Sequence, residues 1–144
     1  MPMIDVYATT GTFSEPTALA QRLADSLMEI EAVPKIALFR KNTAAFVHEL
    51  PVGAISNVDG DSNYVRVQVL TNAGALSREQ QIAVVSSFVT LVADAAGDPS
   101  LVDRTWVLLT EAEAVPGGWG LRGHAHTNEE IVAAARADIA ALGA

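Results

Sequence analysis

The residue with the most distinctive chemistry in this sequence is Pro2, which follows the start methionine and precedes a strand-like stretch, Met3–Thr9. An initiator methionine is generally removed when a small residue such as proline comes next. The chain would then begin with a secondary amine at the end of a strand, and no other residue type offers such an amine. Because a secondary amine can act as a base or a nucleophile, Pro2 is the first candidate catalytic residue.

The other potential ligand groups form weaker patterns. His124 and His126, with Glu129 and Glu130 close behind, carry donor atoms for a metal ion, but no third, separated ligand follows at a suitable spacing. Asp59–Asp61 has carboxylates but lacks the rest of a calcium loop. The sequence therefore predicts no metal site, and these stretches are expected to be a polar loop before a helix and a turn.

Several other chemistries are excluded by residue type. The chain has no cysteine, which removes disulfides, thiolate catalysis and cysteine-ligated zinc. The glycines of 117–120 are not followed by the lysine and hydroxyl of a phosphate loop. No serine has histidine and aspartate partners at the spacing of a known hydrolase motif. We therefore expect chemistry that needs neither a metal nor an organic cofactor.

Length, charge and hydropathy limit the class of protein. The 144 residues are enough for one domain, and half of them are hydrophobic, which is ample for a core. The net charge of −8 argues against nucleic acid as a partner. No apolar run is long enough to cross a membrane, and no signal peptide precedes the first strand. These features predict a cytoplasmic protein.

The first half of the chain has the pattern of a strand, a helix and further strands. Met3–Thr9 alternates like a strand, Ser14 is a suitable N-cap, and Pro16 suits a first helical turn. The helix is expected to run to about Glu31, with one apolar face formed by Leu19, Leu23, Leu27 and Ile30.

The region after this helix is predicted to return to the sheet. Pro34 helps to end the helix, and Ile36–Arg40 is predicted to be the second strand. Ala44–Leu50 has the pattern of a further short strand, at an edge or in a hairpin. Residues 51–63 are rich in Gly, Asn and Asp and are predicted to be a linker.

The second half repeats this order. Tyr64–Leu70 alternates like a strand, and Ser77 with Gln80 forms a capping box for a helix that ends at Gly97. The apolar face of this helix is expected to consist of Ile82, Val85, Phe88, Val89 and Val92. Thr105–Leu109 is then an apolar strand.

The end of the chain adds a turn and a third helix. Val115–Gly123 is predicted to be a glycine-rich turn. Thr127 and Glu130 form a second capping box, which opens a C-terminal helix over 127–142. The apolar face of that helix is expected to contain Ile131, Ala135, Ile139 and Leu142.

The two halves match at a nearly constant offset. Pro34 and Pro99 lie 65 residues apart, and Ser14 and Ser77 lie 63 apart. This predicts an α/β fold of two tandem β-α-β units, over 2–50 and 64–123, with a four-stranded sheet and two helices on one face. The bare face of the sheet must be buried, and we expect copies of the chain to bury it in a homo-oligomer.

This arrangement resembles the tautomerase superfamily, which includes 4-oxalocrotonate tautomerase, macrophage migration inhibitory factor, malonate semialdehyde decarboxylase and the cis-3-chloroacrylic acid dehalogenases. The resemblance covers roughly residues 2–123 and rests on Pro2, Thr110-Glu111 at the end of a strand and Gly118-Trp119-Gly120. It implies a homotrimer with an active site at each Pro2, whose amine acts as a general base.

The resemblance also implies residues that line the pocket. Trp106 stands where relatives place an arginine or tyrosine, and Trp119 stands where they place an aromatic residue that shields the proline. By strand parity, Arg104, Trp106 and Leu108 share a face. A cation is needed to hold a substrate carboxylate or carbonyl oxygen, and Arg40 is the first choice, followed by Arg122 and Arg104. Each arginine also fits a solvated surface charge.

The sequence departs from the family at three places. The dehalogenases and the decarboxylase carry paired arginines where this chain has 71–76, which contains none. Gly118 replaces the glutamate with which the dehalogenases activate water, and no arginine stands near Gly11, where 4-oxalocrotonate tautomerase has one. These departures disfavour hydration of a haloacrylate and a dicarboxylate substrate. They favour keto–enol tautomerisation of a small 2-oxo acid or aryl pyruvate.

Three alternatives remain open from the sequence. The chain could be a trimeric, non-catalytic binding protein of the same fold, or a related decarboxylase or hydratase. It could also be a small α/β ligand-binding domain with unrelated chemistry, such as a ferredoxin-like dimer, in which the repeat would persist and Pro2 would have no special role.

Overall fold

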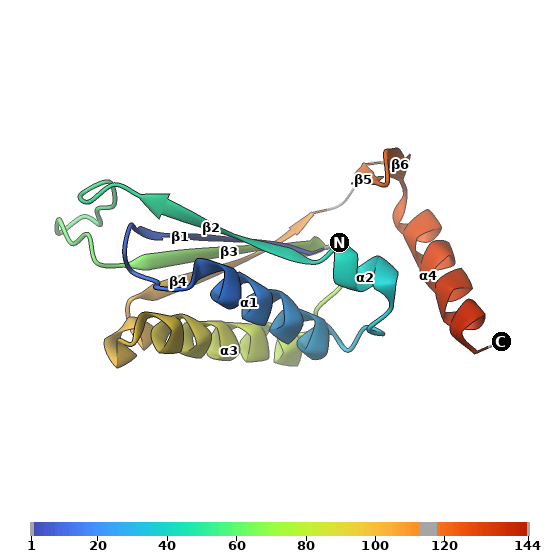
Figure 1. Cartoon of the computed structure of the whole chain (residues 1–144), viewed down its shortest axis with the longest axis horizontal. Coiled ribbons are helices and arrows are strands. Elements are labelled where there is room, and N and C mark those ends of the chain that lie inside the picture. The colour runs from blue at the N-terminus through green and yellow to red at the C-terminus, as the bar shows by residue number, and fades with distance from the viewer. Residues whose placement is uncertain (1, 113–117, 144) are drawn as a thin grey trace.

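A four-stranded sheet carries two long helices on one face, and a shorter helix and the C-terminal segment lie beyond one end of the sheet (Figure 1). The computed structural model describes residues 2–112 and 118–143. The sheet contains β1 (Met3–Thr9), β2 (Ala44–Leu50), β3 (Val65–Asn72) and β4 (Thr105–Ala112). The two long helices are α1 (Pro16–Glu31) and α3 (Arg78–Ala96).

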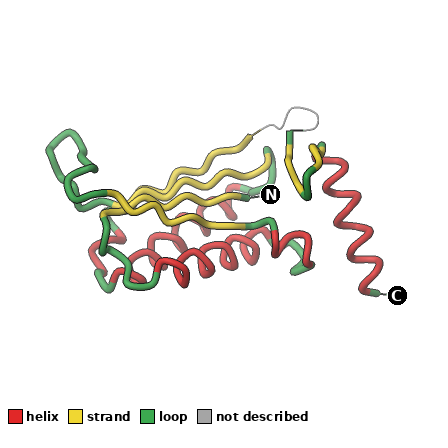
Figure 2. The backbone as a smooth tube through the Cα atoms, turned by 45° about the horizontal axis from the view of Figure 1, so that its top comes forward, coloured by secondary structure: helices red, strands yellow, loops and turns green. Residues whose placement is uncertain are grey.

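The strand order, β2-β1-β3-β4, confirms the two tandem units. β1 pairs in parallel with β2 across α1, β3 pairs in parallel with β4 across α3, and the two units join through the antiparallel pair β1 and β3. The segment between β2 and β3, where the linker is predicted, forms the long loop at the opposite end of the sheet from the N-terminus (Figure 2).

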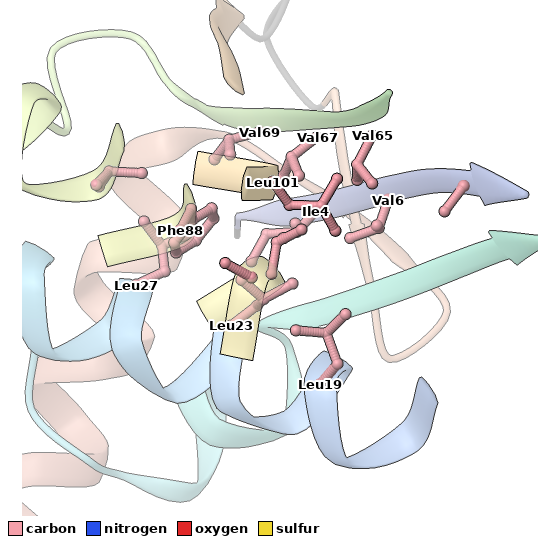
Figure 3. Packing of buried hydrophobic residues seen from close by; sticks show 14 of the residues in the cluster. Ile4, Val6, Leu19, Leu23, Leu27, Val65, Val67, Val69, Phe88 and Leu101 are labelled. Atoms are coloured by element: carbon pink, nitrogen blue, oxygen red, sulfur yellow. The ribbon is translucent and has the colours of Figure 1, made fainter. Parts of the chain in front are cut away.

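Alternation along β1 and β3 builds the core. Every second residue faces the helices and is almost fully buried, whereas the residues between them face the other side. Figure 3 shows this core between the sheet and the helices. The fully buried members include Ile4, Val6, Leu19, Leu23, Leu27, Val67, Val69, Val84, Phe88 and Val92.

The helix caps agree only partly with the sequence analysis. The Ser77–Gln80 capping box and the left-handed Gly97 cap of α3 are both present, as predicted. Pro16 occupies the first turn of α1, but the predicted cap Ser14 is wrong, because Glu15 is the N-cap and its side chain makes no capping bond. Proline at this position lacks the N–H that a cap would otherwise satisfy.

The buried face of α3 differs from the predicted one. Phe88 and Val92 are buried as expected, but Val84 completes the stripe, while Ile82 is 55% exposed and Val85 is 38% exposed. The reason is that α3 carries apolar residues around most of its circumference, so its periodicity does not select one face.

The predicted strand Ile36–Arg40 is wrong. Residues Ala37–Lys41 form a short helix, α2, and the parallel partner of β1 is instead Ala44–Leu50. A short apolar run has no periodicity that distinguishes a strand from a buried turn of helix. Ile36 and Leu38 are buried, but in a separate cluster beyond the end of the sheet.

That second cluster joins α2 to the C-terminal segment. Trp119 and Leu121 come from β5 (Trp119–Leu121), which pairs with β6 (His124–His126), and Ile131 and Ala135 come from α4 (Asn128–Leu142). The Thr127–Glu130 capping box is present as predicted. In contrast, the predicted core residues Ile139 and Leu142 are exposed, because α4 extends past the elements it packs against (Figure 1). Residues 113–117 of the predicted glycine-rich turn lie outside the described residues.

The sheet face opposite the helices is uncovered in the protomer. Phe46, Trp106 and Leu108 project from it and are 40–49% exposed. The Tyr7 and His48 rings stack with centroids 4.5 Å apart on the same face. Within the described ranges no helix is long and apolar enough to cross a membrane.

The neighbouring valines of α3 test the observed burial. Val84→Ala is expected to lower the free energy of unfolding by about 2–3 kcal/mol, because it removes two methyl groups from a fully buried site. Val85→Ala, with the same helix propensity change at a partly exposed site, is expected to cost less than about 1 kcal/mol. Urea unfolding followed by circular dichroism measures both. Equal losses would contradict this orientation of α3.

Candidate active site

Pro2 is buried at the start of the inner strand β1, with a strand on either side. Its carbonyl oxygen accepts a hydrogen bond from the Ala44 N–H at 3.4 Å. Met3 pairs with Ala44 on one side and with Leu70 on the other. If this register is extended by one residue toward the N-terminus, Pro2 lies between Thr43 and Thr71.

Thr43 and Thr71 are the two buried polar side chains of the described chain, 8% and 3% exposed respectively. Like Pro2, both follow the alternation that faces the helices rather than the bare side of the sheet. At this end of the sheet, Pro2 therefore has a threonine beside it on each side, Thr43 next to β2 and Thr71 in β3.

A groove of about 820 Å³ runs beside this end of the molecule, between α1, α2 and the start of β2. Met28 contributes from α1, Ala44 from the start of β2 and Thr43 from the position just before it, so the groove reaches the residues next to Pro2. Arg40, the first choice for the substrate cation, also lines it. Its guanidinium donates to the Lys35 carbonyl oxygen, which holds an exposed side chain at the groove.

Glu31 is the last residue of α1, and its half-buried carboxylate interacts electrostatically with the amino terminus of the chain. Burial raises the pKa of the Glu31 carboxyl above its usual range, and the positive charge at the amino terminus of the chain opposes this shift. An anion at this position affects any amine nearby, because it favours the protonated form.

Arg104, Trp106 and Leu108 lie away from Pro2 within one protomer. Trp106 pairs with Arg66, which itself pairs with Tyr7, far along β1 from its start. Arg104 precedes β4 and bonds the Asp98 carboxylate at 2.8 Å. Hydrogen bonding by Ser100, with a smaller contribution from Arg104, holds the pKa of the Asp98 carboxyl below its usual range.

These contacts give Arg104 a structural role at the base of β4. Its guanidinium also bonds the Ser100 hydroxyl and the Asn63 carbonyl oxygen. The Trp106 ring stacks on Tyr64 with centroids 4.5 Å apart. In a single protomer, neither side chain is available to a substrate at Pro2.

Trp119 and Arg122 belong to the C-terminal segment. Trp119 is 7% exposed in the second cluster, and its indole N–H has no hydrogen-bond partner in the part of the chain that the structure describes. Arg122 is exposed in the turn between β5 and β6, with a left-handed φ of 52°. Trp119 thus packs within the protomer, in the second hydrophobic cluster.

No group of three or more potential metal ligands occurs within residues 2–112 and 118–143. His124 and His126 are exposed and half-buried respectively, with ring centroids 6.4 Å apart in an edge-on arrangement. His126 Nδ1 lies 3.9 Å from the Glu130 carboxylate, which itself caps α4. These contacts belong to the segment that leads from β6 into α4.

The sequence analysis missed three groups near Pro2. Thr71 could have been noticed, because it continues the buried alternation of Val65, Val67 and Val69 with a hydroxyl instead of an apolar group. Thr43 could not, since the strand that contains Ala44 had no predicted partner or register. Glu31 could not be recognised from the sequence either, because its position depends on how α1 packs against the sheet.

Comparison with solved structures finds this fold in several proteins. Pt0534 inactivated by 2-oxo-3-pentynoate matches with a TM-score of 0.70 and 20% identity over 88% of this chain and 97% of its own. A fused 4-OT wild type, an asymmetric trimer, matches at 0.67 and 19% over 85% and 94%. Malonate semialdehyde decarboxylase matches at 0.65 and 17% over 92% and 97%.

At these identities the likeness establishes the fold, and no family model or curated protein matches the sequence. The structures named here belong to the tautomerase superfamily. The chain therefore has the tautomerase-superfamily fold that its sequence resemblance predicted.

Proposed function

We propose that the chain is a keto–enol tautomerase of a small 2-oxo acid or aryl pyruvate, with the Pro2 amine as general base once Met1 is removed. The observation that carries this proposal is the position of Pro2, buried at the start of an inner strand beside a groove, in a fold shared with fused 4-OT. A rigid amine at that position can accept a proton from one atom of an enol and return it to another.

The surroundings of Pro2 act on the amine in two directions. Burial disfavours the charged ammonium form and lowers the pKa of an amine, as a general base near neutral pH requires. The Glu31 carboxylate opposes this, because a neighbouring negative charge favours the ammonium form. The pH at which the amine titrates therefore depends on the balance between burial and Glu31.

The charges of the groove favour a monocarboxylate. Arg40 and Arg22 line it together with one carboxylate, Asp25. The segment 71–76 on the other side of Pro2 contains no basic residue. A substrate with a single carboxylate, held by Arg40, fits this distribution better than a dicarboxylate held at both ends.

A decarboxylase is the second candidate, and Glu31 is the observation that favours it. If the carboxylate keeps the amine protonated at neutral pH, the Pro2 ammonium would act as a general acid and as a cation that stabilises developing negative charge. The two candidates predict opposite pH dependence. Base catalysis increases as the amine loses its proton, and acid catalysis decreases.

We further infer that the protein works as a homotrimer. The uncovered sheet face carries exposed Phe46, Trp106 and Leu108, which a partner must cover to remove them from water. The fused 4-OT to which the chain is similar is a trimer. Assembly of this kind also supports a role for Arg104 or Trp106 in a neighbouring protomer's pocket.

Pro2→Ala tests the catalytic proposal. Ketonisation of phenylenolpyruvate is expected to fall at least about a hundredfold, because the variant has a primary amine with a different pKa and a less rigid position. Intact mass must first show that Met1 is absent. The inhibitor 2-oxo-3-pentynoate is expected to add covalently to the Pro2 amine. A processed wild type that neither turns over the enol nor is labelled would favour a binding protein.

Glu31→Gln tests the electrostatic balance. Because burial raises the pKa of the Glu31 carboxyl above its usual range, its charge destabilises the fold at pH values above that raised pKa. The variant is expected to melt higher at pH 7, with the gain disappearing below about pH 4. The pH–rate profile should also move to lower pH. Glu49→Gln, at an exposed site, is the control, and identical profiles in all three proteins would refute this role.

Leu108→Lys tests the trimer. A lysine in the buried centre of an assembled sheet face costs desolvation energy, so the native mass is expected to fall from three protomers to the 15.1 kDa of one. Light scattering after gel filtration measures this mass. Ile82→Lys, on the helix-covered side of the protomer, should remain trimeric. A monomeric wild type would contradict the proposal.

A further inference from the structure

Lys35 is bound to the C-terminal part of α1 by two carboxylates. Asp25 and Glu29 are spaced i, i+4, which places them on one face of the helix. Ala32 ends the helix in a left-handed conformation, after which the chain turns and the Lys35 ammonium returns to that face. Its Nζ atom lies 3.0 Å from Asp25 Oδ1 and 3.1 Å from Glu29 Oε1. We refer to these three side chains as the Lys35 clamp.

Stability alone does not account for the Lys35 clamp. Its three side chains are between 50% and 62% exposed, and ion pairs at such exposure contribute little to the free energy of unfolding. Hydrogen bonds to Asp25 and Glu29 raise the pKa of the Lys35 ammonium above its usual range, so the ammonium is charged at neutral pH. The effect of the clamp therefore depends on which negative charge this ammonium neutralises.

The two carboxylates of the clamp differ in what they face. Asp25 lines the groove between α1, α2 and the start of β2, together with Arg22 and Arg40. Glu29 is not among the described residues that line it. An uncompensated carboxylate in this groove would attract a guanidinium and would repel the carboxylate of a substrate. The Lys35 ammonium compensates the one carboxylate that has this position.

Arg40 is the groove cation that the clamp leaves free. Arg22 already lies 4.0 Å from the Asp94 carboxylate. Arg40 forms no ion pair with a carboxylate of residues 2–112 and 118–143, and its guanidinium donates instead to the Lys35 carbonyl oxygen. Lys35 thus contacts Arg40 through its main chain and Asp25 through its side chain. Both contacts keep the Arg40 guanidinium available to an anion in the groove.

We propose that Lys35 is a positioning residue for the reaction: it holds the Asp25 carboxylate away from Arg40, so that Arg40 can bind the carboxylate of a 2-oxo monocarboxylic acid. This inference rests on the function proposed for Pro2 and on the role of Arg40 in it. Lys35 does not touch the substrate in this arrangement. Because the substrate carboxylate is bound equally before and during the proton transfer, the effect of Lys35 falls on KM rather than on kcat.

Lys35→Met tests the proposal, because it keeps an unbranched apolar side chain and removes the ammonium. The KM for phenylenolpyruvate is expected to rise about three- to tenfold, with kcat unchanged within about twofold. Lys35→Arg can still bond both carboxylates and should keep KM within about twofold of the wild type. Lys41→Met is the matched control, since Lys41 is the only other lysine of the chain and is exposed.

A second set of variants separates the electrostatic role from a structural one. In an Asp25→Asn background, Lys35→Met should change KM by less than about twofold, because no carboxylate is left to act on the groove. An equal rise of KM in both backgrounds would mean that Lys35 has only a structural role and would overturn the proposal. Glu29→Gln removes the carboxylate outside the groove and should leave KM within about twofold of the wild type. A rise as large as that of Lys35→Met would contradict the specific role of Asp25.

The outcomes also separate this inference from the proposed function. An unchanged KM in Lys35→Met, with Pro2→Ala inactive, would overturn the positioning role and leave the Pro2 mechanism standing. If the processed wild type is inert, the dissociation constant of phenylpyruvate, measured by calorimetry, takes the place of KM. A loss of affinity of about three- to tenfold in Lys35→Met that disappears in the Asp25→Asn background supports the inference. Unchanged or absent binding overturns it.

Discussion

The structure depends on β1 being paired along both of its edges. Parallel pairing with β2 and antiparallel pairing with β3 fix the register of the inner strand, on both edges from Met3 to Tyr7. A slip of one residue would turn Ile4, Val6 and Ala8 away from the helices and remove the core. The same constraint places Pro2 between its two neighbouring strands. The burial of the core and the geometry of the candidate site are therefore consequences of one pairing arrangement.

The parts of the fold that could be predicted from the sequence are those with a local cause. Alternation defines β1 and β3, and the Ser77 and Thr127 capping boxes mark two helix starts, because each signal involves residues close in the chain. The α2 segment could not be assigned, since five residues carry no periodicity. The buried face of α3 and the outward face of α4 depend on which elements are present to pack against them.

The same distinction applies to the candidate site. A strand begins immediately after Pro2, so its position at the sheet end follows from the local sequence. Its two threonine neighbours come from residues 43 and 71, and only the strand register brings them to it. Strand parity correctly put Trp106 and Leu108 on one face, but it contained no information on their distance from Pro2 along the sheet. The parity of a residue along its strand determines which face of the sheet its side chain is on, whereas the strand register determines which residues lie beside it.

The balance of charge around Pro2 is what can distinguish this chain from others with its fold. A site with paired arginines holds anions by Coulomb attraction and also lowers the pKa of a nearby amine. This chain has threonine at 71 and a half-buried carboxylate at Glu31, a combination that attracts anions less strongly and that, beside an amine, favours its protonated form. An enzyme with these groups needs hydrogen bonds and burial to supply what cations would otherwise contribute.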